Sequence, residues 1–289
     1  MNSRKRYRLR LPSRTLKLGE RTLLMGVLNV TPDSFFDGGR FQDSQAAIAR
    51  AFEIERAGAD ILDIGGESTR PGSDPVTAEE ELDRVLPVLE GLRGKLRIPI
   101  SLDTQKAAVA EAGIAAGVEI INDVTGLRND PSMADLVSRH RVGVVLLHMR
   151  GTPKTMHEGP FASHVMRDVA SGLRAAAAQA LRAGIAKDRL LIDPGIGFGK
   201  GFAQNFELLH RLPELARLGY PLVVGTSRKA FVGWALADKG EPWPADKREW
   251  GTAATITAAI LGGAHVVRAH DVVEMAQVAR VADAIAAAR

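Results

Sequence analysis

The chain has 289 residues, of which 45% are hydrophobic and 25% charged, with a net charge of +4 and no cysteine. These values are ordinary for a globular protein, and the length fits one α/β barrel or two average domains. The lack of cysteine excludes disulfides, thiolate metal sites and a cysteine nucleophile. No apolar stretch is long enough for a membrane-spanning helix and no signal-peptide core follows Arg4-Lys5-Arg6, so we expect a cytoplasmic protein without a membrane partner.

The basic residues are scattered except between Arg4 and Arg10, and aromatic residues make up only 5% of the chain. A nucleic-acid-binding surface usually combines a basic stripe with interleaved aromatic side chains. We therefore expect no nucleic-acid partner. Part of the positive charge could instead attract an anionic small substrate.

Residues 7–11 and 15–18 alternate between apolar and polar side chains, with Pro12-Ser13-Arg14 between them. This pattern predicts an antiparallel hairpin. We expect residues 1–21 to form an extension packed on one barrel domain of residues 22–289. Such a hairpin could close the bottom of the barrel.

Eight short apolar runs follow the hairpin, and each ends on a polar or ionisable residue. They lie at residues 23–28, 61–64, 98–102, 120–121, 142–147, 190–192, 222–224 and 266–267. Runs this apolar are typical of parallel strands buried on both faces. The carboxyl ends of eight such strands meet at one rim if the sheet closes into a barrel, and such a rim carries the chemistry of that fold.

Helical patterns fill the intervals between the runs. The first lies at residues 44–57, with Ser44 as a possible N-cap, and a second helix begins after a capping box at Thr77. The others lie at residues 107–116, 131–139, 165–183, 204–218 (with a break at Pro213), 252–261 and 272–288. A further helix begins after Lys229, and residues 238–250 indicate a long loop. The alternation predicts the α/β class, as a (β/α)8 TIM barrel with an N-terminal β-hairpin.

Asp103, Asn122 and Asp193 each stand at the end of a different predicted strand. Two carboxylates and an amide suit a flat ligand edge with several N–H donors, such as an amino-pyrimidinone. Each residue taken alone could instead cap a turn or a helix.

Cationic residues follow other strands. Arg70 lies in a glycine-rich loop, Lys229 precedes a helix, and Arg268 and His270 are two residues apart, so that both could point to one face of the last strand. These groups favour binding of an anion, although each could also be a solvated side chain at a turn.

The remaining candidates are weaker. Phe198 lies between glycines in residues 193–200 and could present its ring to a planar ligand, but the spacing matches no known phosphate loop. His148 has no second histidine nearby and is interpreted as a rim residue whose hydrogen bonds are satisfied. No zinc motif is present, whereas Mg²⁺ carried with a phosphate substrate stays open.

Several long motifs resemble those of the dihydropteroate synthases, within the wider family of pterin-binding barrels. The resemblance covers roughly residues 22–289. Its motifs are residues 25–35, Gly65-Gly66-Glu67-Ser68-Thr69-Arg70-Pro71-Gly72, Ile121-Asn122-Asp123, residues 193–200, Ser227-Arg228-Lys229 and Arg268-Ala269-His270-Asp271.

This resemblance implies condensation of 6-hydroxymethyl-7,8-dihydropterin pyrophosphate with p-aminobenzoate, giving dihydropteroate and pyrophosphate, with Mg²⁺ as cofactor and a homodimer as the assembly. Carried over by position, Asp103, Lys229, Arg70 and Asp37 look catalytic. The pterin contacts would be Asp103, Asn122, Asp193 and Lys229. The pyrophosphate contacts would be Asn29, Thr69, Arg70, Arg268 and His270, with Asn29 also as metal ligand. The p-aminobenzoate pocket would contain Thr69, Pro71, Phe198, Lys229 and Phe35.

Two alternatives remain on the same fold. One is a methyltetrahydrofolate–corrinoid methyltransferase, which has no need of the cationic residues around a pyrophosphate. The other is a catalytically silent pterin-binding paralogue, which loss of Asn29, Arg70, Asp103 or Lys229 would suggest; all four are present.

One position departs from the family pattern. Many relatives have serine after the Ser-Arg-Lys motif, and its hydroxyl meets the p-aminobenzoate carboxylate, whereas this chain has Ala230. Our hypothesis is that backbone N–H groups at the helix start suffice for this carboxylate. Ala230→Ser should therefore lower the KM for p-aminobenzoate by less than about tenfold, equivalent to roughly 1.4 kcal/mol, and steady-state kinetics would contradict the hypothesis if the drop were larger.

Overall fold

The computed structural model describes residues 4–31, 39–68, 72–156, 158, 160–237 and 240–288. Eight parallel strands form one sheet in the order β8-β7-β6-β5-β4-β3-β10-β9. A bridge between Ile192 and Leu222 joins the two edge strands and nearly closes the barrel, which confirms the predicted fold. The strands are β3 (Leu23–Asn29), β4 (Ile61–Gly65), β5 (Ile100–Asp103), β6 (Ile120–Asp123), β7 (Gly143–Leu147), β8 (Leu190–Asp193), β9 (Val223–Gly225) and β10 (Val266–Ala269).

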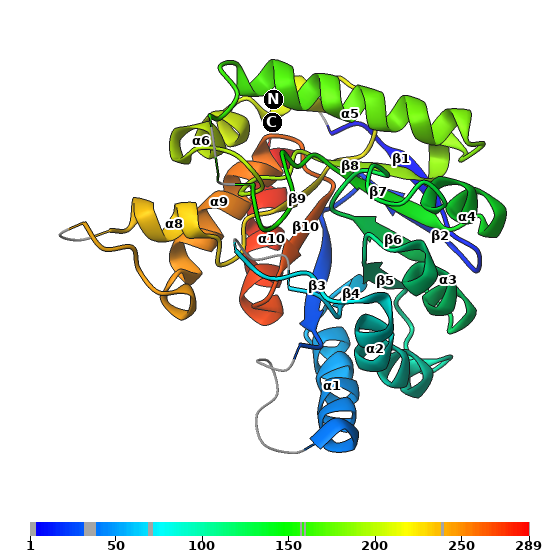
Figure 1. The fold of residues 1–289 in the computed structure, drawn as a ribbon. Helices are drawn as coiled ribbons and strands as arrows, with labels where there is room; N and C mark the ends of the chain where they lie inside the picture. The colour runs from blue at the N-terminus through cyan, green and yellow to red at the C-terminus, as the bar shows by residue number, and fades with distance from the viewer. Residues whose placement is uncertain are drawn as a thin grey trace.

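Helices surround the strands on the outside of the barrel (Figure 1). They are α1 (Gly39–Arg56), α2 (Ala78–Leu92), α3 (Ala107–Ala115), α4 (Met133–His140), α5 (Val165–Arg182), α6 (Phe202–His210), α7 (Leu212–Ala216), α8 (Ala230–Ala235), α9 (Glu249–Leu261) and α10 (Val272–Ala287). Within the described ranges, none of them combines the length and the apolar character that crossing a bilayer requires.

Most predicted helix ends agree with the structure. The capping box is present, since Glu80 N donates to Thr77 Oγ1 at 3.1 Å and Thr77 N donates to Glu80 Oε2 at 2.8 Å. The predicted N-cap Ser44 is wrong, because α1 begins at Gly39 and Ser44 is a buried residue inside it. The predicted loop 238–250 is shorter than expected, because a 3₁₀ turn (Ala245–Lys247) leads directly into α9 at Glu249.

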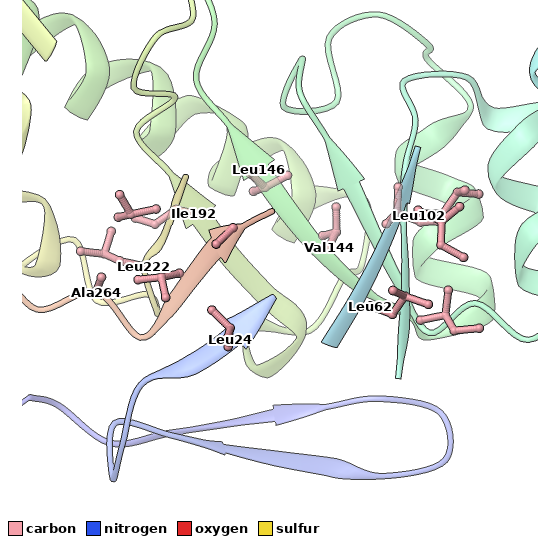
Figure 2. Close-up of a cluster of buried hydrophobic side chains, with 14 of the residues drawn as sticks. Leu24, Leu62, Leu102, Val144, Leu146, Ile192, Leu222 and Ala264 are labelled. Atoms are coloured by element: carbon pink, nitrogen blue, oxygen red, sulfur yellow. The ribbon is translucent and has the colours of Figure 1, made fainter. Parts of the chain in front are cut away.

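The two faces of each strand pack in different layers. Outward side chains such as Leu62, Leu102 and Leu146 join the main core beneath the helices (Figure 2). Inward side chains form a separate layer inside the barrel, which contains Met25 of β3, Ile61 of β4 and apolar residues of β6, β7, β8, β9 and β10. Burial of the strands on both faces explains why their sequences are continuous apolar runs.

The hairpin of β1 (Tyr7–Arg10) and β2 (Thr15–Leu18) lies across the amino ends of the strands (Figure 2). Its buried residues Leu9, Leu11 and Leu18 belong to the same inner layer as Met25 and Ile61. The inner layer is thus closed from below by apolar contacts, and any open space for chemistry must lie above it.

We expect Leu18→Ala to destabilise the fold by about 2–5 kcal/mol, because it removes a fully buried side chain and leaves a cavity. Denaturant unfolding measures this loss. The exposed neighbour Lys17 provides the control, since Lys17→Ala should change the free energy of unfolding by less than about 0.5 kcal/mol. Equal effects at the two positions would show that the hairpin does not contribute to the core.

Candidate active site

Polar side chains replace apolar ones directly above the inner layer. Asp63 lies two residues beyond Ile61 on β4, Asn122 two beyond Ile120 on β6, and Arg268 two beyond Val266 on β10. Residues two apart on a strand point to the same face, so these side chains enter the barrel interior toward the carboxyl ends of the strands. The sequence therefore places a polar layer on an apolar floor.

Arg268 joins two carboxylates in this layer. Its Nε donates to Asp63 Oδ2 at 2.6 Å, and its Nη2 donates to Asp103 Oδ2 at 2.8 Å. Asn122 Nδ2 also donates to Asp63 Oδ2, at 3.2 Å. The second oxygen of Asp63 is buried and has no hydrogen-bond partner among the described residues. Two buried carboxyl groups thus share one guanidinium.

Asp103 is tuned to titrate near neutrality. The pKa of its carboxyl is raised from 3.8 to about 7. Burial is the main cause, the Arg268 guanidinium lowers the pKa, and the neighbouring Asp63 carboxylate adds to the rise. The free site consequently binds a proton or an N–H donor readily. Asp103 does not cap a helix, because α3 begins after Lys106.

Lys229 and Asp193 lie on the other side of the mouth. Burial lowers the pKa of Lys229 to about 8, although Asp193 favours its charged form. The Lys229 ammonium donates to the Ile196 carbonyl and lies 4.4 Å from the centroid of the Phe198 ring, a cation–π contact. Burial raises the pKa of Asp193. Its Oδ1 accepts a hydrogen bond from Gly195 N at 2.7 Å, so Asp193 also caps the turn that follows it, which was the alternative interpretation of this residue.

Arg268 and His270 lie apart in the structure. Arg268 points into the polar layer, but β10 ends at Ala269, so His270 is not on the strand as we had predicted. His270 lies instead beside the β9 end, with Nδ1 3.0 Å from Ser227 Oγ and its backbone N donating to that oxygen at 3.2 Å. This places His270 next to Ser227-Arg228-Lys229 rather than beside Asp103.

The backbone at Arg228 is left-handed, with φ of 59°, which is unfavourable for a side chain of this size. Several contacts hold it there. Arg228 Nε donates to Asp271 Oδ2 at 3.1 Å, Arg228 N donates to Thr252 Oγ1 at 3.1 Å, and Arg248 Nη1 donates to Arg228 O at 2.8 Å. The strained residue sets the direction of Lys229, which follows it.

Asn29 ends β3 and is half-buried. Gly65 lies between Asn29 and Asp103, since a Cβ added there would be 3.9 Å from Asn29 Oδ1 and 3.5 Å from Asp103 Cβ. In the parts of the chain that the structure describes, no three His, Asp or Glu side chains gather around a metal position. One amide oxygen suits Mg²⁺, which keeps several waters and takes most other ligands from substrate phosphates.

Five predicted site residues lie outside the described residues: Phe35, Asp37, Thr69, Arg70 and Pro71. The other eight occur in the described part of the mouth or just beside it. Sequence reasoning missed Asp63, which is fully buried and binds both Arg268 and Asn122. The available signal was an ionisable residue inside the apolar run 61–64, because a carboxylate in such a strand needs a partner.

Sequence reasoning also gave Lys200 no role of its own. This lysine is only 3% exposed, and its Nζ lies 3.0 Å from His148 Nδ1. Burial lowers the pKa of His148 to about 3, so its imidazole is neutral.

Comparisons with known proteins agree on one family. The family model for "Pterin binding enzyme" matches residues 25–270. A dihydropteroate synthase of Synechocystis sp. is 45% identical over 267 residues, covering 92% of this chain and 91% of the relative. Among solved structures, the dihydropteroate synthase of Xanthomonas albilineans with 4-aminobenzoic acid superposes with a TM-score of 0.90 at 42% identity, covering 99% and 100% of the two chains. The same enzyme in complex with 7,8-dihydropteroate gives a TM-score of 0.86 at 40% identity, covering 98% and 100%.

Proposed function

This chain belongs to the dihydropteroate synthase family of pterin-binding enzymes, and we propose that its barrel mouth condenses 6-hydroxymethyl-7,8-dihydropterin pyrophosphate with p-aminobenzoate. The products are 7,8-dihydropteroate and pyrophosphate. The observation that carries the assignment of the site is the ion-paired cluster of Asp63, Asp103 and Arg268 above an apolar floor, with Lys229 across the mouth.

The acceptors of this mouth suit the pterin. The carboxylates of Asp103 and Asp193 and the amide of Asn122 present acceptors, and one donor, to a planar ring edge that carries N–H groups. All three side chains are at most 8% exposed, so their hydrogen bonds form away from bulk water, where each is stronger. A ligand N–H also offers Asp103 a partner other than Arg268.

The cations suit the leaving group. As the C–O bond to pyrophosphate loosens, negative charge grows on the phosphate oxygens and positive charge on the pterin methylene carbon. Arg268 and His270 would stabilise the former and Asp103 the latter. The aromatic amine of p-aminobenzoate attacks that carbon and then loses a proton, so no strong general base is needed. Arg70 and Asp37 stay in the proposal on the family resemblance alone.

The proposal is tested by following pyrophosphate release with purified protein, both substrates and Mg²⁺. Formation of dihydropteroate, identified by mass spectrometry, should require both substrates. Product without p-aminobenzoate, or none with the full mixture, would contradict the proposal. Methyl transfer from methyltetrahydrofolate to a corrinoid, assayed in parallel, is the outcome that would support the alternative enzyme class.

Mg²⁺ dependence follows from the proposed role of Asn29. The residues present fit the ion, because Asn29 would supply one oxygen ligand and the pyrophosphate and water the rest. When bound, Mg²⁺ neutralises charge on the departing pyrophosphate. EDTA should abolish turnover and added Mg²⁺ restore it, while Asn29→Ala should raise the half-saturating Mg²⁺ concentration about tenfold or more. Full activity in EDTA would remove the metal from the proposal.

The homodimer remains a proposal that rests on the family resemblance, and the cytoplasmic location remains the expectation given in the sequence analysis. Sedimentation at working concentration tests the first, and fractionation of producing cells tests the second.

A further inference from the structure

The loop of residues 194–200, which we call the β8 loop, forms the wall beside Lys229. The Ile196 carbonyl accepts from the Lys229 ammonium, and the Phe198 ring lies beneath it. A Cβ at Gly197 would come within 2.8 Å of Lys229 Cδ. Three consecutive parts of this loop, a carbonyl, a glycine and a ring, therefore fix the Lys229 side chain.

Lys200 ends this loop and is buried. Its Nζ donates to the His148 carbonyl at 2.6 Å and lies 3.0 Å from His148 Nδ1. With the Lys200 amine as donor to both atoms, Nδ1 accepts and the imidazole proton lies on Nε2, which faces Asp168 Oδ2 at 3.7 Å. Both hydrogen-bond partners of Lys200 thus belong to one residue at the end of β7, rather than to a carboxylate.

The β8 loop lies directly on the chain after β7. A Cβ at Gly195 would be 2.0 Å from the His148 carbonyl oxygen, and one at Gly199 would be 2.8 Å from the Arg150 carbonyl oxygen. Both glycines also have positive φ, of 63° and 69°. This close approach needs glycine, but glycines alone leave the loop free to move away, so a side chain must hold it in place.

We propose that Lys200 is a positioning residue, whose amine fastens the β8 loop to His148 so that Ile196 and Phe198 hold Lys229 at the mouth. A second anchor acts on the opposite side, where Gly197 N donates to Asn205 Oδ1 at 2.7 Å. The proposal rests on the proposed function only for the consequence in catalysis. The geometry of Lys229 itself can be tested without substrates.

Lys200→Met tests the proposal because methionine retains most of the apolar stem and lacks the amine. It leaves the His148 carbonyl without its donor, so the loop should loosen and admit water around Lys229. Water relieves the burial that lowers the pKa of Lys229, and that pKa should therefore rise from about 8 toward its usual value of 10.5. Competitive acetylation of Lys229 across pH, quantified by mass spectrometry, measures this shift.

In the assay of dihydropteroate formation, Lys200→Met should raise the KM for p-aminobenzoate about tenfold or more and reduce kcat less, since binding at a misplaced Lys229 is weakened. Lys187→Met is the matched control. Lys187 lies in the 3₁₀ turn before β8, with its ammonium 5.0 Å from the centroid of the Tyr220 ring and outside the mouth. Its loss should change neither the Lys229 pKa nor the KM.

Chemical rescue separates the amine from packing. Because the chain has no cysteine, Lys200→Cys introduces a unique thiol. Aminoethylation of this thiol under denaturing conditions, followed by refolding, restores an amine at nearly the original length, whereas ethylation adds a neutral chain. The aminoethylated protein should recover the Lys229 pKa and the KM, and the ethylated one should not.

The outcomes are distinguishable. A Lys200→Met protein that loses thermal stability but keeps the Lys229 pKa and the KM would overturn the proposal, since Lys200 would then be merely structural. If that variant does not fold, Asn205→Ala removes the second anchor of the same loop and must shift the Lys229 pKa upward; an unchanged value overturns the proposal. Absence of turnover by the wild type would contradict the proposed function but would leave the acetylation result intact.

Discussion

Replacing Asp103 by asparagine will lower kcat/KM for dihydropteroate formation by about 10²–10³-fold, because the amide keeps the shape of the side chain and removes its charge. The carboxylate is 8% exposed and hydrogen-bonded to Arg268, so its field acts in a site that excludes most water. The pyrophosphate-release assay at low substrate concentration measures the loss. Asp188→Asn is the control, because this carboxylate pairs with Arg10 of the hairpin and its loss should not change kcat/KM.

The pH dependence of kcat/KM is a second test of the role of Asp103. The pKa of Asp103 is raised to about 7, so its carboxylate is protonated below that pH; the pKa of Lys229 is lowered to about 8, so its ammonium loses its proton above that pH. If the active form needs both charges, kcat/KM follows a bell with its maximum between these values. Asp103→Asn should remove the acid limb and keep the alkaline limb. An acid limb that persists would belong to another group, and Asp193, whose pKa burial also raises, is the next to test.

The barrel was predictable because its strands are buried on both faces. A run such as residues 142–147 has no polar residue until His148, so its length and its end can be recognised from sequence alone. The hairpin was predictable for the opposite reason, since its strands have one polar face. The start of α1 was not, because residues 39–43 carry no apolar period and Ser44 offered a cap that the helix does not use.

The arrangement of charges within the mouth was harder to predict than its composition. Sequence analysis assigned Asp103 to the pterin and Arg268 to the pyrophosphate as separate groups, whereas the structure pairs them at 2.8 Å. Pairing across a barrel depends on which strands face each other. Asp103 on β5 and Arg268 on β10 are 165 residues apart in the sequence. Asp63 was missed because a single carboxylate inside an apolar run does not disturb the strand pattern.

The guanidinium of Arg268, which pairs with both Asp63 and Asp103, leads to predictions about the free energy of unfolding. Arg268→Ala leaves Asp63 and Asp103 in the same buried layer without the cation that joins them. We expect the substitution to destabilise the fold by about 3 kcal/mol. This is the low end of the range for breaking a buried ion pair, because the Arg268 side chain is 20% exposed. It should also abolish measurable turnover, since the leaving group loses a cation. Denaturant unfolding and the pyrophosphate assay measure the two effects.

Adding Asp63→Ala to Arg268→Ala should make the protein more stable, not less, because it removes one of the two unbalanced carboxylates. Asp63→Ala alone should cost little stability, since Arg268 keeps Asp103 as its partner. It should nevertheless lower kcat/KM by roughly 10²-fold, because Arg268 then binds Asp103 alone and Asn122 loses its acceptor. A double variant less stable than Arg268→Ala would show that Asp63 is held by packing rather than by charge.

The pH dependence of the Arg268→Ala penalty provides the last check. Removing Arg268 takes away the cation that lowers the pKa of Asp103, so this pKa should rise above its present value of about 7. An acid whose pKa is higher in the folded than in the unfolded state destabilises the fold above its unfolded pKa, and the penalty grows until the folded pKa is passed. Arg268→Ala should therefore lose less stability at pH 5 than at pH 8. The double variant with Asp63→Ala should show a weaker dependence, because one carboxylate alone is easier to keep ionised than two that share a buried layer.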